Sequence, residues 1–170
     1  MIDKSVYVYD NFFTEEIRSE IFELLLRPMW SPCSGGTSIN WFWHINDLEK
    51  EDYFNSYLFN IICKKLNKNF TIQRIYANGQ SSSQIGTPHV DNSDPNAVTF
   101  VYYPNPEWAL DWNGHLIFSE DEIEPSKIIG YKPNRAVYFP SNITHYADAP
   151  HKRYTGFRIS LAYKLLNIEV

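Results

Sequence analysis

The chain has 170 residues and a mass of 20.0 kDa, which suits one domain with a hydrophobic core and is short for two. Hydrophobic residues make up 44% and charged residues 21%, which excludes disordered and fibrous classes, and an aromatic content of 16% favours a β-rich fold around a pocket. The net charge of −5 gives no overall attraction for a phosphate backbone, so nucleic acid is not expected as a partner.

The sequence shows no targeting segment and no cysteine framework. Residues 1–4 lack the basic stretch and the apolar run of a signal peptide, and no window is long and apolar enough for a membrane span. Cys33 and Cys63 are the only cysteines and do not form a CxxC pair, which excludes a thiolate zinc site. We therefore expect a cytoplasmic protein with reduced thiols and no membrane partner.

The N-terminal part of the chain predicts a helix after a short extended run at 6–9. Thr14 can cap this helix, and acidic residues follow it in the first turn. Ile21 and Leu25 belong to an apolar face with helical spacing, and Pro28 ends the segment.

A loop and a second helix are expected next. The loop at 31–40 contains proline, glycine and small polar residues and is flanked by tryptophans. The helix is expected over about 48–66, with Tyr53, Tyr57 and Ile61 on one face. These helices would support the strands that follow.

The rest of the chain predicts strands. Runs of β-branched and aromatic residues recur at 70–76, 97–103, 114–118, 127–130, 136–139 and 157–165. Turn signals such as Asn78–Gly79 and Asn113–Gly114 separate them. We predict an α+β, mainly β protein with a single domain over 1–170, its helical support at about 10–68 and its jelly-roll core at about 70–166.

The segment around His89 and Asp91 is the first candidate for chemistry. One residue separates them, so in an extended chain both side chains point to the same face. Alone, this pair is equally well explained as an ordinary surface pair. His145, just beyond the strand predicted at 136–139, changes the balance, because two imidazoles and one carboxylate can occupy one face of an octahedron, as in non-haem Fe(II) oxygenases. Zinc hydrolysis can use the same ligands, but no Glu adjoins either histidine.

The last predicted strand adds an anion receptor. Arg158 and Ser160 share one face of this strand, and apolar residues alternate on the other face. An arginine that points inward from an apolar strand requires an anionic partner, because an unpaired buried charge is costly. Guanidinium and hydroxyl together suit a carboxylate. A solvent-facing Arg158, or one paired with an internal acid, is the alternative.

Taken in order, these segments resemble the 2-oxoglutarate and Fe(II)-dependent dioxygenases, and most closely the prolyl hydroxylase-like branch that includes the oxygen-sensing prolyl hydroxylases. The resemblance runs from about Arg74 to Lys164, over half of the chain. It is carried by Arg74–Tyr76, His89–Asn92, Val98–Tyr103, Asn113–Leu116, Arg135–Phe139, His145 and Arg158–Ser160. The family fold that it implies is a double-stranded β-helix, a cupin-like jelly roll with N-terminal supporting helices.

The resemblance implies two groups of site residues: the iron ligands His89, Asp91 and His145, and the 2-oxoglutarate-binding residues Arg158, Ser160, Tyr103 and Tyr76. Arg158 would pair with the distal carboxylate of 2-oxoglutarate, helped by Ser160. For Tyr103 and Tyr76, a role as core aromatics is an equal alternative. No catalytic residue is implied beyond the metal centre.

Two departures from the family pattern stand out. Arg158 lies farther beyond His145 than in close relatives, so the loop at 147–156 is expected to bulge, and Arg153 becomes a competing anchor. We prefer Arg158 because its strand context matches the family, whereas Arg153 lies in a turn-like segment. Asn113 also replaces the first glycine of a usual Gly-Gly pair, which would alter that turn without reaching the metal.

The implied chemistry is oxidative decarboxylation of 2-oxoglutarate to succinate and CO2, coupled to hydroxylation of an unactivated C–H bond. The implied cofactors are Fe(II), 2-oxoglutarate as cosubstrate and O2, with ascorbate as an optional addition. The leading substrate is a prolyl or other peptidyl residue, and the tryptophans near 31–40 and 108–112 are expected to border the site. Three alternatives stay open: the same chemistry on a small metabolite such as a free amino acid or a sugar derivative, a non-catalytic metal-binding jelly-roll module, and a zinc hydrolase on a similar scaffold.

Overall fold

A computed structural model of the chain describes residues 5–32, 42–121 and 123–168. In this part of the chain the strands are β1 (Tyr7–Tyr9), β2 (Ser31–Pro32), β3 (Trp43–Ile45), β4 (Phe70–Gln80), β5 (Ala97–Tyr103), β6 (Leu116–Ser119), β7 (Pro125–Ile129), β8 (Arg135–Pro140), β9 (Thr144–Ala147) and β10 (Arg158–Asn167). The helical segments are α1 (Glu15–Leu25), a 3-10 turn at Leu48–Lys50, a π-helical segment at Tyr53–Leu58, α2 (Phe59–Leu66) and a 3-10 turn at Leu110–Trp112.

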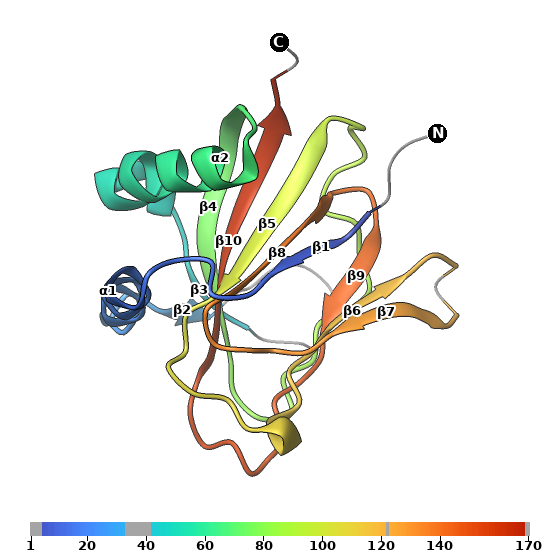
Figure 1. The fold of residues 1–170 in the computed structure, drawn as a ribbon. Helices are drawn as coiled ribbons and strands as arrows, with labels where there is room; N and C mark the ends of the chain where they lie inside the picture. The colour runs from blue at the N-terminus through green and yellow to red at the C-terminus, as the bar shows by residue number, and fades with distance from the viewer. Residues whose placement is uncertain (1–4, 33–41, 122, 169–170) are drawn as a thin grey trace.

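Two antiparallel sheets form the body of the molecule, and the helices pack on the larger one (Figure 1). The large sheet has the strand order β1-β8-β5-β10-β4-β3-β2, and the small sheet has the order β7-β6-β9. Strand β10, close to the C-terminus, lies between β4 and β5, so the end of the chain completes the centre of the large sheet. This architecture confirms the predicted α+β, mainly β class.

Hydrophobic side chains pack on both faces of the large sheet. One core cluster joins the helices to the sheet and includes Ile21 of α1, Ile62 of α2 and Leu161 of β10. A second cluster lies between the sheets and includes Phe118 of β6 and Phe139 of β8. Complete burial of such a side chain stabilises the fold by about 1.5–3 kcal/mol, so the sheet is held firmly from both sides.

Helix α1 forms as the sequence predicts. The Thr14 hydroxyl accepts a hydrogen bond from the backbone N–H of Ile17 at 3.4 Å, and two glutamates occupy the first turn. Ile21 and Leu25 are fully buried against the sheet. The helix ends at Leu25, shortly before Pro28.

The second predicted helix, over 48–66, is interrupted in the structure. A short 3-10 turn ends at Lys50, and Glu51 adopts an extended backbone before the helical segments begin. The Glu51 carboxylate accepts two hydrogen bonds from the guanidinium of Arg27, at 3.0 and 2.9 Å. This pair links the break to the segment that follows α1.

The buried face of that helical region also differs from the prediction. The structure buries Phe54, Leu58 and Ile62 in place of Tyr53, Tyr57 and Ile61. Both rows have helical spacing, so spacing alone cannot choose between them. The tyrosines keep their hydroxyls near solvent, where Tyr53 donates to Glu20 at 2.8 Å, and the purely apolar row enters the core.

Strand β4 continues beyond the end predicted at Tyr76, and the Asn78–Gly79 turn is wrong. Both residues lie within β4, where Asn78 is opposite Ser160 and Gly79 is opposite Ile159 of β10. A Cβ atom on Gly79 would lie 2.1 Å from the ring of Phe157. Glycine is therefore placed here because an aromatic ring packs on the backbone, not because the chain turns.

Other differences concern short strands. The sequence did not predict β3 or β9, and β9 carries His145. The strands expected at 114–118, 127–130 and 157–165 are present with ends displaced by one or two residues. Of the loop predicted at 31–40, the first two residues form β2, and the others lie outside the described residues.

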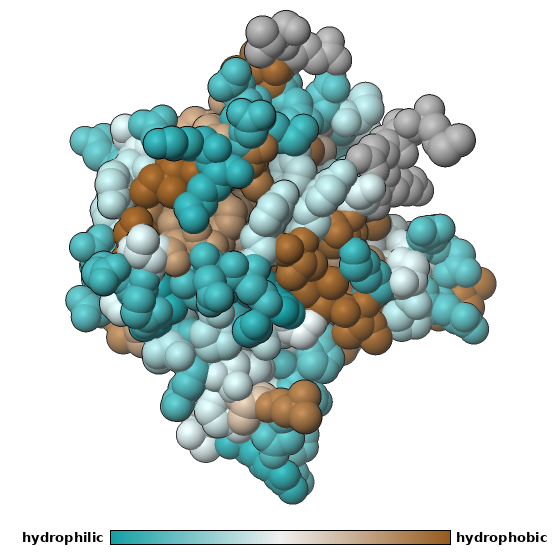
Figure 2. Space-filling model, viewed as in Figure 1, coloured by the Kyte–Doolittle hydropathy of each residue, from teal (hydrophilic) through white to brown (hydrophobic). Residues whose placement is uncertain are grey.

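On the face shown in Figure 2, hydrophobic residues lie in separate patches divided by polar residues. The most exposed apolar side chains in the described ranges are Leu110 and Ile123, at 97% and 83%. Such isolated apolar residues are ordinary on soluble folds.

Asn134 is the polar residue that fastens the N-terminal segment to the large sheet. Its side-chain oxygen accepts from Phe13 N at 3.0 Å and from the Tyr102 hydroxyl at 2.9 Å, and its amide nitrogen donates to Phe13 O at 2.8 Å.

Because Asn134→Ala leaves buried partners unsatisfied, we expect it to lower the free energy of unfolding by about 2–3 kcal/mol in urea titrations. Asn60→Ala, on the exposed side of α2, serves as the control and should change it by less than about 0.5 kcal/mol. Equal effects of both variants would contradict this role.

Candidate metal centre and adjoining pocket

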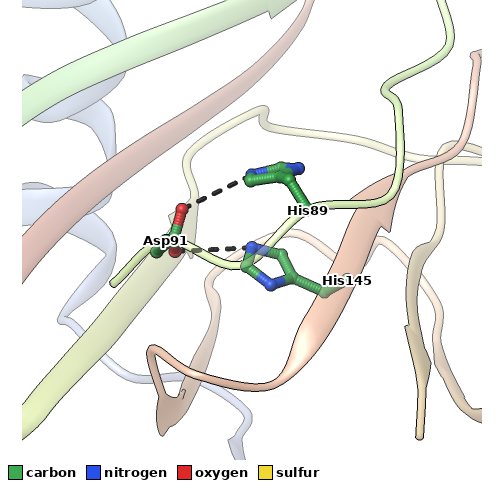
Figure 3. Close-up of side chains that lie close together, drawn as sticks. All are labelled: His89, Asp91 and His145. Atoms are coloured by element: carbon green, nitrogen blue, oxygen red, sulfur yellow. Dashed lines mark ion pairs between the residues drawn. The ribbon is translucent and has the colours of Figure 1, made fainter. Parts of the chain in front are cut away.

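The structure brings His89, Asp91 and His145 together, although the last is distant in sequence (Figure 3). Backbone hydrogen bonds join His89 and His145 in both directions, at 3.1 and 2.9 Å. The backbone N–H of Asp91 donates to Ser141 O at 2.9 Å. The segment with the His-x-Asp pattern is therefore attached to β9 and to the turn before it, which fixes where its side chains point.

Both histidines present the same ring nitrogen to Asp91. The Nδ1 atom of His89 lies 2.8 Å from Thr87 O, and that of His145 lies 2.8 Å from Ile143 O. A carbonyl oxygen only accepts hydrogen bonds, so each Nδ1 carries a proton, and a neutral ring keeps its lone pair on Nε2. This is the tautomer in which Nε2 can bind a metal.

The distances suit a shared ion. His89 Nε2 lies 3.4 Å from one carboxylate oxygen of Asp91, and His145 Nε2 lies 3.4 Å from the other. The candidate ligand atoms of all three residues lie within 4.8 Å of one another. The side chains of Asp91 and His145 are 7% exposed and that of His89 is 51% exposed, so the cluster is open to solvent on the His89 side.

Asp91 is held as a carboxylate. Its Oδ2 accepts from the Thr99 hydroxyl at 2.7 Å and pairs with the ammonium of Lys164. Burial alone would raise the pKa of Asp91, but the adjoining imidazoles of His145 and His89 and the charge of Lys164 bring it below its ordinary range. The Asp91 carboxylate in turn raises the pKa of His89, so a metal would compete with a proton there.

The cluster opens into a cavity between the sheets that is lined by polar residues as well as by apolar ones. A larger hollow of about 480 Å³ lies elsewhere, against Tyr7, Tyr138 and Pro140. Its described lining contains no histidine and no carboxylate. The smaller cavity is therefore the site with metal-binding chemistry.

Arg158 lies in this cavity and is 1% exposed. Its Nε donates to Gly114 O at 2.9 Å, and one terminal nitrogen donates to the side-chain oxygen of Gln80 at 2.7 Å. Among the described residues, no carboxylate lies within ion-pair distance of it. A buried guanidinium with neutral partners only has the chemistry to bind an anion.

Two of the other predicted residues lie beside this guanidinium. Ser160 is buried on the same face of β10 and lines the cavity. Burial raises the pKa of Tyr103, and its ring centre lies 5.4 Å from the central carbon of the Arg158 guanidinium. Within the described ranges the Tyr103 hydroxyl has no hydrogen-bond partner, so a ligand at Arg158 can supply one.

Tyr76 and Arg153 are placed differently. Tyr76 lines the cavity, and its ring centre lies 4.4 Å from the central carbon of the Arg74 guanidinium and 6.0 Å from the ring centre of His44. Arg153 is exposed and pairs with Asp111 at 2.8 Å. The geometry thus favours Arg158 over Arg153 as the residue that faces the cavity.

Sequence reasoning missed three polar residues of the cavity and its wall, namely Asn78, Gln80 and Lys164. The first two were hidden by the turn assigned to Asn78–Gly79. Lys164 was within the predicted strand, and its even spacing from Arg158 and Ser160 was the signal that it faces the same way.

The predicted aromatic border of the site is only partly described. Trp108 and Trp112 do not line the cavity, and they pack against Tyr154, with ring centres 4.5 and 4.6 Å away. Their contacts support the loop near Arg158 rather than the metal side. Most of the segment at 31–40 lies outside the described residues.

Comparison with known families agrees with this chemistry. Residues 73–163, more than half of the chain, match the model of a family described as the 2OG-Fe(II) oxygenase superfamily. The chain belongs to this superfamily. It is a 2-oxoglutarate-dependent dioxygenase, and the resemblance to that class seen in the sequence is confirmed.

Solved structures show the same fold at low sequence identity. A prolyl hydroxylase from Trichoplax adhaerens, in complex with a peptide of the hypoxia inducible factor oxygen degradation domain, is 18% identical with a TM-score of 0.69, over 97% of this chain and 84% of that one. A Pseudomonas putida prolyl-4-hydroxylase is 15% identical with a TM-score of 0.69, over 98% and 94%. HygX from Streptomyces hygroscopicus, with nickel and 2-oxoglutarate bound, is 10% identical with a TM-score of 0.74, over 96% and 83%. The predicted double-stranded β-helix is thereby confirmed.

Two further comparisons gave negative results. No curated protein matches the sequence significantly. In the described ranges, no helix has both the length and the apolar character needed to cross a membrane.

Gly114 lets the backbone approach Arg158 closely. Its φ is +71°, and an added Cβ would lie 2.9 Å from the Arg158 side chain and 3.0 Å from the ring of Trp108. The preceding Asn113 keeps the turn with a φ of 53°, and its carbonyl accepts from Trp108 Nε1 at 3.0 Å, so the missing glycine of the pair does not remove the turn.

We expect Gly114→Ala to lower the free energy of unfolding by about 1–3 kcal/mol, because the new methyl group strains the backbone and displaces Arg158. Gly130→Ala is the matched control, since the nearest side-chain atoms to an added Cβ lie 4.0 Å away. Thermal and urea unfolding of both variants measure the difference. If Gly130→Ala destabilises the protein as much, crowding at Gly114 is not the cause.

Proposed function

We propose that the chain hydroxylates an unactivated C–H bond with Fe(II), 2-oxoglutarate and O2, and that a prolyl or other peptidyl residue is its target. His89, Asp91 and His145 bind the iron in this proposal, and Arg158 binds the distal carboxylate of 2-oxoglutarate. The observation that carries it is the presence, in one cavity, of this cluster and of a buried guanidinium without an acidic partner.

The donor set fits the metal. Two neutral imidazoles and one carboxylate on one side of an ion leave the opposite positions free, the arrangement typical of non-haem Fe(II) oxygenases. The hydrogen bonds from both Nδ1 atoms to backbone carbonyls hold the rings in the tautomer that this requires. Thr99 and Lys164 contact Asp91 Oδ2, which also faces His145 Nε2, while Oδ1 faces His89 Nε2.

The polar lining fits the cosubstrate. Arg158 can pair with a carboxylate, while Ser160 and the unpartnered hydroxyl of Tyr103 can donate to it. Tyr76 borders the same cavity from β4. When bound, iron and 2-oxoglutarate together supply the oxidative decarboxylation that releases succinate and CO2 and oxidises the substrate. The protein's residues fix both ligands and limit access of water from the sheet side.

Two similar structures are prolyl hydroxylases, one of them solved with a peptide, and this supports a peptidyl target. The half-exposed side chain of His89 also supports a peptidyl target, because a segment of a substrate peptide can reach the metal from that side. HygX has the same fold and has also been solved with hygromycin B bound, which keeps a small-molecule substrate as the second candidate. Ascorbate dependence and a cytoplasmic location stay predictions.

The first test is succinate formation. We expect the protein to bind Fe(II) and 2-oxoglutarate anaerobically and to form succinate when O2 is admitted, because uncoupled turnover does not need the prime substrate. His89→Ala should abolish succinate through loss of iron. Arg158→Met should weaken 2-oxoglutarate binding by about 10–100-fold, since it removes a charge-assisted pair. Isothermal titration and succinate assays measure both effects.

Arg153→Met is the control, because Arg153 is exposed and pairs with Asp111. It should retain both binding and succinate formation. Loss of 2-oxoglutarate binding in this variant alone would reassign the anchor. Full binding of both ligands without succinate would favour the non-catalytic module, and zinc-dependent hydrolysis without 2-oxoglutarate would favour the hydrolase.

A further inference from the structure

Lys164 places an ammonium group inside the same cavity as the candidate metal centre. Its side chain is 16% exposed, and the residue lines the cavity together with Asp91 and Tyr76. Its Nζ pairs with Asp91 Oδ2 and lies 3.4 Å from the Thr99 hydroxyl. Lysines are rarely buried to this extent without a dedicated partner.

The partner of Lys164 is shared with the metal. Among the residues that the structure describes, Asp91 provides the only carboxylate within ion-pair distance of Lys164. In the proposed function the same carboxylate binds Fe(II). The ammonium then has no anion of its own, and a buried charge in that position is costly.

A count of the charges in the cavity also leaves one cation without an anion. A divalent metal, Arg158 and Lys164 bring four positive charges into the cavity. Asp91 and the 2-oxoglutarate dianion bring three negative charges. One positive charge is left over, and a neutral substrate would not compensate it.

The position of Lys164 points to the substrate rather than to the cosubstrate. Arg158, Ser160 and Lys164 lie on one face of β10, and Arg158 is the most deeply buried of the three. Lys164 is opposite Arg74 in the ladder, and Arg74 is exposed. The Lys164 ammonium therefore lies beside Asp91 of the cluster, away from the fully buried part of this face that holds Arg158.

We propose that the substrate carries a carboxylate close to the carbon that is oxidised, and that Lys164 binds this carboxylate. The single leftover charge matches a carboxylate monoanion, from an acidic residue of a peptide or from a free acid. The proposal rests on the proposed function and narrows its substrate class. The alternative to this proposal is that Lys164 binds no substrate and only holds Asp91 in place.

The test uses matched probes and paramagnetic relaxation. Protein loaded with Mn(II), which is redox-inert here, and 2-oxoglutarate is mixed with N-acetyl-L-proline or N-acetyl-L-prolinamide, and with N-acetylglycine or N-acetylglycinamide. Within each pair only the carboxylate differs. Mn(II) enhances the proton relaxation of any probe that resides beside it, so NMR reports proximity to the site without turnover.

We expect at least one acid to show about tenfold greater relaxation than its amide, equivalent to about 1.4 kcal/mol of preferential binding. Lys164→Met should reduce this preference to less than about twofold, and Lys164→Arg should retain most of it because the charge remains. Lys152→Met, at an exposed turn position, is the control and should behave like the wild type. Circular dichroism and melting curves confirm that each variant is folded.

Equal relaxation by acid and amide in both pairs, including no relaxation by any probe, contradicts the proposal. So does an acid preference that survives in Lys164→Met, because the carboxylate would then be bound by the metal itself or elsewhere. Lower Mn(II) affinity in Lys164→Met with an unchanged acid preference assigns Lys164 to the support of Asp91 alone. The methylene protons of 2-oxoglutarate serve as an internal reference: if Mn(II) does not relax them, the proposed function fails, whatever the probes do.

Discussion

Strand β10 presents different chemistry on its two faces, and both the core and the cavity depend on this. On one face Leu161 and its neighbours pack into the cluster shared with the helices. On the other face Arg158, Ser160 and Lys164 line the cavity. Because β10 is paired on both sides, its register is fixed by two ladders, and a shift of one residue would exchange apolar and charged faces. The pairing of β10 thus places cations in the cavity at the centre of the sheet, where anionic ligands would stabilise them.

Much of this arrangement could be predicted from local pattern. Alternation in the last strand placed Arg158 and Ser160 on one face, and the His-x-Asp spacing placed His89 and Asp91 together. Ligand chemistry made His145 a candidate and the resemblance to a family implied it as a ligand, but its convergence on the pair depends on a backbone bridge between distant segments. No local signal marks such a bridge. The extension of the predicted domain over the whole chain stays a prediction.

The errors have physical causes of three kinds. Asn78–Gly79 has the composition of a turn, but packing of Phe157 on the glycine keeps the chain extended, and this contact comes from the far end of the sequence. In the second helix, two rows with the same spacing competed, and burial went to the row without hydroxyls, which includes Phe54. Lys164 was missed for a third reason: a lysine near the end of a strand is usually solvated, and only the position of Asp91 shows that this one is not.

The central claim is that the two ends of one cavity bind a metal and the cosubstrate. A crystal structure of the protein grown anaerobically with Mn(II) and 2-oxoglutarate tests it most directly. The account predicts the metal on His89 Nε2, His145 Nε2 and an oxygen of Asp91, with the distal carboxylate of 2-oxoglutarate against Arg158. A metal bound elsewhere, or a carboxylate placed against Arg153, would contradict it.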